Sequence, residues 1–266
     1  MQFSYFDVHS HLNLSPLQEN KDEIINTLRQ QGVGTITVGV DYETSKIALD
    51  MANENPDILW ATVGQHPNDN PEEVFDYEKY LELSKNKKVV AIGECGLDYF
   101  RLKGSEEEKE IEVERQKNLF IQHINLAKEA GKPLMIHARP HVGSMDAYTD
   151  AIRILEREQF TGLVNFHFFV GDIETAQKIV SSGWTVSFDG PITFVSEYDE
   201  VIRSIPIENI MAETDAPFAS PMPHRGKTNY PHYVEYVYKR IAEIKGIGED
   251  EARIQLFSNI KRVFDI

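Results

Sequence analysis

The chain has 266 residues, a mass of 30.4 kDa and a single cysteine, Cys95. Acidic residues outnumber basic ones 43 to 27, and the formal net charge of -16 argues against a protein that coats nucleic acid with a basic face. No apolar run approaches the roughly 20 residues that a membrane span needs, and the N-terminus lacks a signal-peptide pattern. We therefore expect a cytoplasmic protein with no membrane contact and no obligate protein partner, and the lone cysteine fits a reducing compartment.

Short apolar segments rich in β-branched residues alternate along the chain with segments of helical periodicity. The predicted strands are Tyr5–His9, Gly34–Val40, Leu59–Gly64, Val89–Glu94, Pro133–His137, Leu163–His167, Thr185–Phe188 and Ile210–Glu213. The predicted helices are Lys21–Gln31, Glu43–Glu54, Glu106–Ala130, Asp146–Glu158, Asp172–Ser181, Glu197–Ser204, Tyr233–Lys245 and Asp250–Phe264. Ser105 followed by Glu108 predicts a capping box at the start of the longest helix.

Strands that alternate with helices predict βαβ units, a parallel sheet and right-handed crossovers. Eight such units most simply close into an α/β (β/α)8 TIM-type barrel, a fold that commonly takes about 250 residues. An open doubly wound sheet is the alternative, but no glycine-rich phosphate loop follows the first predicted strand. Because no repeat, low-complexity segment or linker marks a boundary, we expect residues 1–266 to form a single domain.

Two histidines, His9 and His11, stand at the end of the first predicted strand in the segment "YFDVHSH". Residues two apart in a strand face the same side, so both imidazoles can point at one metal ion. Two solvated histidines at a strand terminus are the alternative explanation. The pair alone does not decide between them.

Other predicted strands also end in side chains that bind metals. Because the C-terminal strand ends of a barrel meet at one mouth, side chains from five strands converge there. Each could instead be a satisfied core histidine or a helix-capping carboxylate, but six such coincidences at one end of a sheet are improbable. The predicted metal ligands are His9, His11, Glu94, His137, His167 and Asp215.

Six ligands exceed the need of one tetrahedral ion but suit two ions that share a carboxylate. Imidazole and carboxylate ligands fit Mg, Mn or Zn better than a metal that prefers thiolates. Glu94 is the natural bridge between the two ions. Asp215 could hold one ion and take a proton from the attacking water, so both residues are predicted to be catalytic.

The motifs "FDVHSH", "GECGLDY", "PLMIHAR", "ETDAPF" and "PMPHRGKTN" together resemble the TatD-related deoxyribonucleases of the metal-dependent hydrolase, amidohydrolase-like superfamily. The resemblance spans nearly the whole chain and includes "VGQHP" and "SFDGPITF". It implies a (β/α)8 barrel and hydrolysis of DNA phosphodiester bonds by a metal-bound hydroxide at a two-metal site. Carried over residue by residue, it implies the same six ligands. We expect a 3′-5′ exonuclease-like enzyme that contacts DNA mainly through phosphates.

The sequence departs from the family pattern at two places. Phe168 follows the strand-six histidine, where the family usually has a small residue. Pro140 follows "IHAR", where the family usually has an acidic residue that leads into a helix, and the longer loop "HVGSMDAY" comes next. These differences leave the ligand set intact but affect the expected substrate pocket.

Four further residues are predicted to contact substrate. His66 in "VGQHP" could donate to a phosphate oxygen or only end its strand, and Arg139 could hold a phosphate or pair with a neighbouring acid. The loop after Asp215 brings His224 and Arg225 towards the mouth, where phosphate contact competes with plain solvation.

Other residues near the mouth carry weaker expectations. Aromatic residues there could stack on bases, although packing at a barrel rim is the more frequent role; they are Phe100, Phe168 and Phe218. Cys95 is expected to be a buried hydrophobe rather than a nucleophile, and His123 and His232 receive no catalytic role.

Two other functions remain open at this stage. The first keeps the metal site but cleaves another bond, such as an amide, an ester or the ester of a D-aminoacyl-tRNA, and the negative net charge together with the unusual strand-five loop favours it. The second is a binding protein without catalysis, which is disfavoured because a barrel has no structural need for six such side chains.

Overall fold

The computed structural model describes residues 3–68 and 74–266 of the chain. Within these residues eight strands form one sheet in sequence order, and every neighbouring pair is parallel. The strands are β1 (Tyr5–Ser10), β2 (Val33–Val38), β3 (Leu59–Val63), β4 (Val89–Asp98), β5 (Leu134–Arg139), β6 (Val164–Phe166), β7 (Thr185–Phe188) and β8 (Ile210–Ala212).

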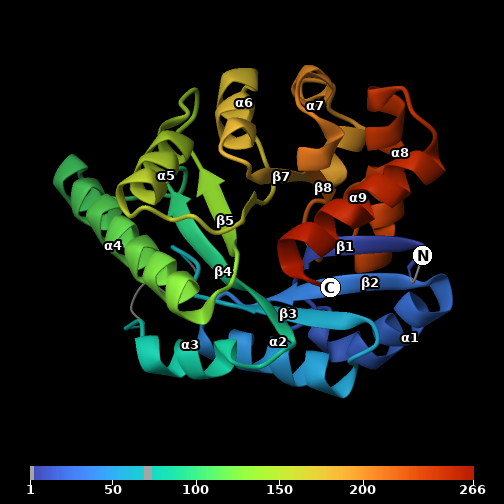
Figure 1. Cartoon of the computed structure of the whole chain (residues 1–266), viewed down its shortest axis with the longest axis horizontal. Helices are drawn as coiled ribbons and strands as arrows, with labels where there is room; N and C mark the ends of the chain where they lie inside the picture. The colour runs from blue at the N-terminus through green and yellow to red at the C-terminus, as the bar shows by residue number, and fades with distance from the viewer. Residues whose placement is uncertain (1–2, 69–73) are drawn as a thin grey trace.

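Helices lie around the outside of the strands (Figure 1). Within the described residues they are α1 (Lys21–Gln31), α2 (Tyr42–Glu54), α3 (Tyr77–Ser84), α4 (Glu106–Ala130), α5 (Asp146–Arg157), α6 (Ile173–Ser181), α7 (Asp199–Ser204), α8 (Val234–Lys245) and α9 (Glu249–Phe264). Short 3-10 turns cover Gln18–Asn20, Gly190–Thr193, Ile207–Asn209 and Pro231–Tyr233. The alternation confirms the predicted α/β barrel.

The barrel closes beyond the end of β8 rather than along it. Ser10 and Ala216 form an isolated parallel bridge, the His11 amide donates to the Ala216 carbonyl at 2.7 Å, and the Asp215 amide donates to the His9 carbonyl at 2.9 Å. These bonds join the two chain segments that carry predicted ligands. Closure and site assembly therefore depend on the same few backbone contacts.

The strands are covered on both faces, as their apolar composition requires. All described residues of β2, β3, β4, β7 and β8 are buried, because side chains fill the barrel interior on one face and helices pack on the other. Polar side chains inside such a barrel need partners, and they lie within the strands, as Thr35 and Ser187 do, as well as at the strand ends.

Most element boundaries lie within a few residues of the predictions. The Ser105 hydroxyl accepts from the Glu108 amide at 3.3 Å and the Glu108 carboxylate accepts from the Ser105 amide at 2.7 Å, so the predicted capping box at α4 is confirmed. Two features differ from the predictions: β4 continues beyond Glu94 to Asp98, and the eight-residue helix α3 was not predicted.

Among the described residues, none of the helices is both long and apolar enough to cross a membrane.

Candidate metal centre

The six predicted ligands come together at the C-terminal end of the barrel. Glu94 and His137 lie within β4 and β5, and His9 lies near the end of β1. The others follow their strands by one to three residues: His11, His167 and Asp215. All are largely buried, so their nitrogen and oxygen atoms depend on one another for partners.

The Glu94 carboxylate lies at the centre of the group, and its two oxygens face different sets of side chains. Oε2 lies 3.4 Å from His9 Nε2 and 3.7 Å from His11 Nε2. Asp215 Oδ1 completes this first set, 3.2 Å from His11 Nε2 and 3.6 Å from His9 Nε2. His9 Nε2 and His11 Nε2 are only 3.2 Å apart. These two nitrogens, with Glu94 Oε2 and Asp215 Oδ1, are four possible metal-ligand atoms around one small volume.

The other oxygen, Oε1, faces a second set of imidazoles. It lies 2.8 Å from His167 Nε2, 3.0 Å from His137 Nδ1 and 3.6 Å from His66 Nε2. The carboxylate is thus shared between two histidine groups. His66, predicted as a substrate contact, lies within this second set.

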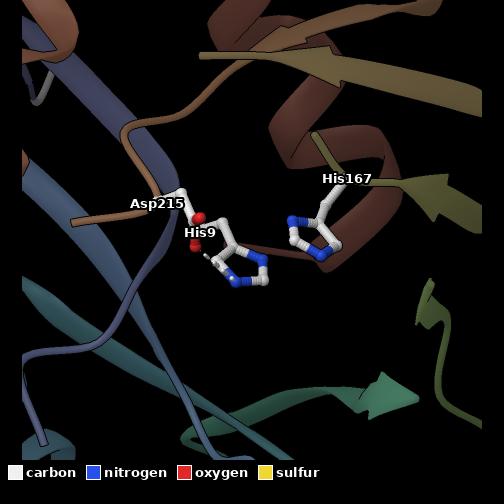
Figure 2. A group of neighbouring side chains, drawn as sticks. All are labelled: His9, His167 and Asp215. Atoms are coloured by element: carbon white, nitrogen blue, oxygen red, sulfur yellow. Dashed lines mark ion pairs between the residues drawn. The ribbon is translucent and has the colours of Figure 1, made fainter. Parts of the chain in front are cut away.

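Figure 2 shows how β1, β6 and the segment after β8 combine in this centre. The rings of His9 and His167 stack face to face, with centroids 3.8 Å apart and planes 11° apart. Asp215 lies beside His9 and has a φ of 53°, a left-handed conformation that aspartate tolerates better than most residues. This backbone conformation turns the carboxylate towards the imidazoles.

The second nitrogen of each predicted histidine ligand has its own partner. His11 Nδ1 donates to the Val38 carbonyl at 3.2 Å, and His9 Nδ1 lies 3.1 Å from Met135 Sδ. With a proton on Nδ1, the neutral His11 ring directs the lone pair of Nε2 towards Glu94 and Asp215.

Two buried carboxylates that the sequence analysis did not assign hold the other two histidines. His137 Nε2 lies 3.2 Å from Asp98 Oδ2, and His167 Nδ1 lies 3.3 Å from Glu213 Oε1. Asp98 and Glu213 are fully buried. A carboxylate on the far nitrogen of a histidine is the usual support for a metal-binding ring, because it fixes the ring and makes the near nitrogen more basic.

Burial and the mixture of charges shift the pKa values within the centre. Burial alone would raise the pKa of Glu94, but His167, His66 and His9 outweigh it and hold that pKa well below its ordinary value. Burial would lower the pKa of His167, yet Glu94 and Glu213 raise it well above its ordinary value. Burial and the neighbouring His167 lower the pKa of His9.

These donors fit divalent metal ions. Three groups of side chains each bring ligand atoms within 4.8 Å of one another: His9, His11 and Glu94; His66, Glu94 and His137; and His9, His167 and Asp215. Lone pairs of imidazoles and carboxylates that meet without a donor repel one another, and a cation between them removes this repulsion. Nitrogen and oxygen ligands at this spacing suit Mg, Mn or Zn.

The centre opens into a cavity of about 610 Å³. Its walls include His66 and Arg139 among the predicted substrate contacts, together with Phe100, Phe168 and Phe218. A larger cavity of about 960 Å³ lies at the opposite end of the strands, lined by Val89, Pro133 and Leu163, far from the predicted chemistry.

The two predicted contacts on the loop after Asp215 have other partners. Arg225 stacks over the Phe194 ring at 4.2 Å, and the His224 ring stacks on Tyr233 with centroids 3.9 Å apart. Neither belongs to the described residues that line the 610 Å³ cavity. Their contact with substrate stays a prediction.

Two residues left outside the chemistry have structural surroundings. Cys95 is fully buried, with Sγ 3.6 Å from the Met135 carbonyl, and burial raises the pKa of its thiol well above the ordinary value. His123 is also buried, and its Nε2 accepts from the Gln65 amide at 2.9 Å, next to His66. His123 therefore supports the backbone that carries His66.

A (β/α)8 barrel with two sets of imidazoles around one glutamate at its C-terminal end defines the class of metal-dependent hydrolases. The sequence model of the family described as TatD related DNase matches residues 6–265, and the chain belongs to this family.

Relatives and solved structures agree with this assignment. The chain is 38% identical to the uncharacterized metal-dependent hydrolase YabD of Bacillus subtilis, over 98% of this chain and 99% of that protein. It is 31% identical to the uncharacterized metal-dependent hydrolase TatD of Mycobacterium tuberculosis, over 98% of this chain and 97% of that protein. The crystal structure of the TatD homolog YJJV from Escherichia coli superposes with a TM-score of 0.84 at 26% identity, covering both chains completely.

Proposed function

We propose that this metal-dependent hydrolase cleaves DNA phosphodiester bonds, in a 3′-5′ exonuclease-like manner, at a centre for two divalent ions. The observation that carries the proposal is the Glu94 carboxylate, whose two oxygens face separate histidine groups. A shared carboxylate of this kind suits two ions that stabilise the attacking and the leaving oxygen of a phosphoryl transfer. The family description, TatD related DNase, supports DNA as the substrate.

The two sets of side chains would each hold one ion. His9, His11 and Asp215 would bind the first with Glu94 Oε2. His137 and His167 would bind the second with Glu94 Oε1, with His66 within reach. When bound, such ions act as Lewis acids that lower the pKa of water and neutralise charge on a phosphate.

The protein's own groups orient the substrate and move the proton. Burial would raise the pKa of Asp215, but His11 and His9 lower it below its ordinary value, so the carboxylate is ionised at neutral pH. An Asp215 carboxylate oxygen can then accept the proton of the attacking water. His66 and Arg139 line the cavity and would donate to phosphate oxygens.

Aromatic rings at the cavity rim would contact the bases. Phe100 and Phe218 are about half exposed, at 49% and 55%, and both line the cavity. Exposed rings beside a phosphate-binding site can stack on bases of any sequence. The proposed substrate contact is therefore mostly to phosphates and ring faces, with little reading of base edges.

Hydrolysis of labelled single-stranded and double-stranded DNA tests the proposal. We expect a chelator to abolish activity, Mg²⁺ or Mn²⁺ to restore it, and Glu94→Gln to lower kcat at least about 100-fold, because the bridging charge is lost. Glu200→Gln, an exposed glutamate on α7, is the matched control and should keep full activity. Oligonucleotides labelled at either end report the direction of cleavage.

Parallel assays with an amide, a lactone and an aminoacyl-tRNA test the other bond types. DNA cleavage that persists in Glu94→Gln would disprove the proposed centre. Metal-dependent cleavage of one of the other substrates, without cleavage of DNA, would keep the centre and overturn the proposed substrate.

A further inference from the structure

The wall of the cavity next to the metal centre carries a group of basic side chains made by Arg101, Arg139 and His141. Among the described residues that line the cavity, the carboxylates are Glu94 and Asp215, both in the predicted ligand set. The remainder of the wall carries arginines, histidines and aromatic rings among apolar residues such as Pro140, Val142 and Met145, in a chain whose formal net charge is -16. Such a local reversal of charge indicates a site for an anion.

His141 belongs to the loop after β5, where the sequence departs from the family pattern. Its Nδ1 lies 2.7 Å from Asp146 Oδ2, and its backbone amide donates to Asp146 Oδ1 at 3.2 Å. The side chain is 49% exposed, and Nε2 has no hydrogen bond within the part of the chain that the structure describes. One nitrogen is thus fixed while the other is available to a ligand.

Asp146 is itself held at the start of α5. Its backbone amide donates to the Ser144 hydroxyl at 3.1 Å, and Oδ1 accepts from the Ala147 amide at 2.8 Å. Burial would raise the pKa of Asp146, but the hydrogen bonds from His141 and Ala147 hold it below its ordinary value. The Asp146 carboxylate therefore anchors the His141 ring on an otherwise exposed loop.

The arginines of this group are also held in place. The Arg139 guanidinium stacks over the Phe100 ring at 4.2 Å, and Arg101 Nε lies 3.7 Å from Asp98 Oδ2. Arg101 follows Phe100 directly, so these cations and this ring lie together. A phosphate bound by arginine beside an exposed aromatic ring is the arrangement that a nucleotide unit requires.

We propose that Arg101 and His141 bind a second phosphate of the substrate, one that is not hydrolysed, and that Asp146 positions His141 for this contact. The inference rests on the proposed function and narrows the substrate class to strands with a phosphate next to the scissile one. In the complex Nδ1 of the His141 ring keeps its contact with Asp146 while Nε2 donates to a phosphate oxygen. The cavity volume of about 610 Å³ exceeds the need of a single phosphate.

Hydrolysis of three dinucleotides in Mn²⁺ tests the second phosphate site. They are thymidylyl-thymidine without a terminal phosphate, with a 5′-phosphate and with a 3′-phosphate. We expect one of the phosphorylated forms to have a KM at least about tenfold below that of the unphosphorylated form, as hydrogen bonds between charged groups allow. The phosphorylated form with the lower KM shows whether the second phosphate lies on the 5′ or the 3′ side of the scissile phosphate.

Variants separate this contact from the metal centre. His141→Ala and Arg101→Ala should raise the KM of the preferred form about tenfold, leave its kcat within about twofold, and not change the KM of the unphosphorylated form. Arg101→Lys should recover part of the loss, and Asp146→Asn should raise the same KM without affecting kcat. Val142→Ala, next to His141 and 87% exposed, is the control that should change neither constant. Bound Mn²⁺ is measured for each variant to show that Asp98 and the centre are intact.

Equal KM values for all three dinucleotides in the wild-type protein would overturn the inference. An equal increase in KM for all three dinucleotides in His141→Ala would overturn it as well. If the wild-type protein hydrolyses none of them, the proposed function fails, and calorimetric titration in Mn²⁺ decides the second site separately. Thymidine 3′,5′-bisphosphate should then bind at least about tenfold more tightly than both thymidine monophosphates, and His141→Ala should remove the difference. Equal binding of all three ligands would contradict a second phosphate site.

Discussion

At the scale of single residues, Asp98 and Glu213 decide how His137 and His167 present their nitrogens. We predict that Asp98→Asn and Glu213→Gln each weaken metal affinity roughly 10- to 100-fold, because the ring loses its fixed orientation and its near nitrogen becomes less basic. Competition with a chromogenic chelator measures the affinity. Asp199→Asn, whose native carboxylate pairs with Arg240 on α8, is the control and should not change it.

If Asp98→Asn and Glu213→Gln both keep a metal affinity within about twofold of the wild-type value, the contacts to the far nitrogens of His137 and His167 do not support metal binding. The Glu213 variant also tests packing, since Glu213 accepts from the Phe168 amide at 2.8 Å and from the Ser187 hydroxyl at 2.5 Å. A thermal-shift measurement in chelator separates loss of fold from loss of affinity, because the metal-free protein reports only the former.

The sequence predicted the six proposed ligands but neither of these two carboxylates. Glu94 directly follows an apolar run, so the pattern alone places a charged group where burial demands a partner. Asp98 lies four residues beyond the predicted end of its strand, where a carboxylate is as easily a helix cap. Glu213, at the predicted end of its own strand, carries the same ambiguity. Only the ring orientations of His137 and His167 reveal these partners, and no sequence pattern encodes a ring orientation.

At the scale of elements, Asp7 ties β1 to the segment that follows β8. Its carboxylate accepts from the Thr214 amide at 2.8 Å, the Thr214 hydroxyl at 2.8 Å and the Thr35 hydroxyl at 3.2 Å. We predict that Asp7→Ala lowers the free energy of unfolding by about 2–4 kcal/mol, since buried donors lose their acceptor. Urea denaturation measures the change.

A double-mutant cycle isolates this contact. Thr214→Val removes the hydroxyl and keeps the shape, so the losses in Asp7→Ala and Thr214→Val should be less than additive by about 1 kcal/mol. Additive losses would mean that the Asp7–Thr214 pair does not hold the two segments together. Thr193→Val, at a hydroxyl that donates to the Gly190 carbonyl within a 3-10 turn, should be additive with Asp7→Ala.

Element boundaries were predictable where local chemistry sets them and not where tertiary contacts do. Ser105 and Glu108 set the start of α4 through their own hydrogen bonds. By contrast, β6 and β8 have only three residues each, although the His167 amide still donates to the Ile136 carbonyl at 3.0 Å and the Glu213 amide to the Phe188 carbonyl at 3.0 Å. Helix α3 has only eight residues; the Asp76 carboxylate caps its start by accepting from the Lys79 amide at 3.3 Å, and the helix packs against α2 and α4.

At the scale of the whole molecule, the barrel was predictable because eight apolar strands alternate with helices, and one topology satisfies that order simply. The unusual loop after β5 and Phe168 were visible in the sequence as departures, but the part of the cavity they form was not. Phe168 takes a φ of 45°, held by the hydrogen bond from its amide to Glu213. Its place on the cavity wall follows from that bond.

Charge in the centre also links metal binding to the stability of the whole chain. Burial would lower the pKa values of His11 and His137, but neighbouring carboxylates raise both above the ordinary 6.5. A histidine with a raised pKa contributes stability that is complete below the unfolded value and is lost as pH rises through the folded one. Glu94 and Asp215 have lowered pKa values, so their contribution is present above their ordinary 4.5 and 3.8 and is lost as pH falls further.

The ionisable groups of the metal-free centre therefore stabilise the fold most between about pH 4.5 and 6.5 and stabilise it less above that window. His9 has a lowered pKa, so its contribution to stability is lost as pH falls, opposite to the contributions of His11 and His137. Metal binding has the opposite dependence, because it needs neutral imidazoles and releases their protons. We predict that the difference in Tm between Mn²⁺-saturated and chelator-treated protein widens from pH 5.5 to pH 8. Differential scanning calorimetry measures it, and the difference should nearly vanish in Glu94→Gln. A difference in Tm that stays constant from pH 5.5 to pH 8 would show that protons and metal ions do not compete for the centre.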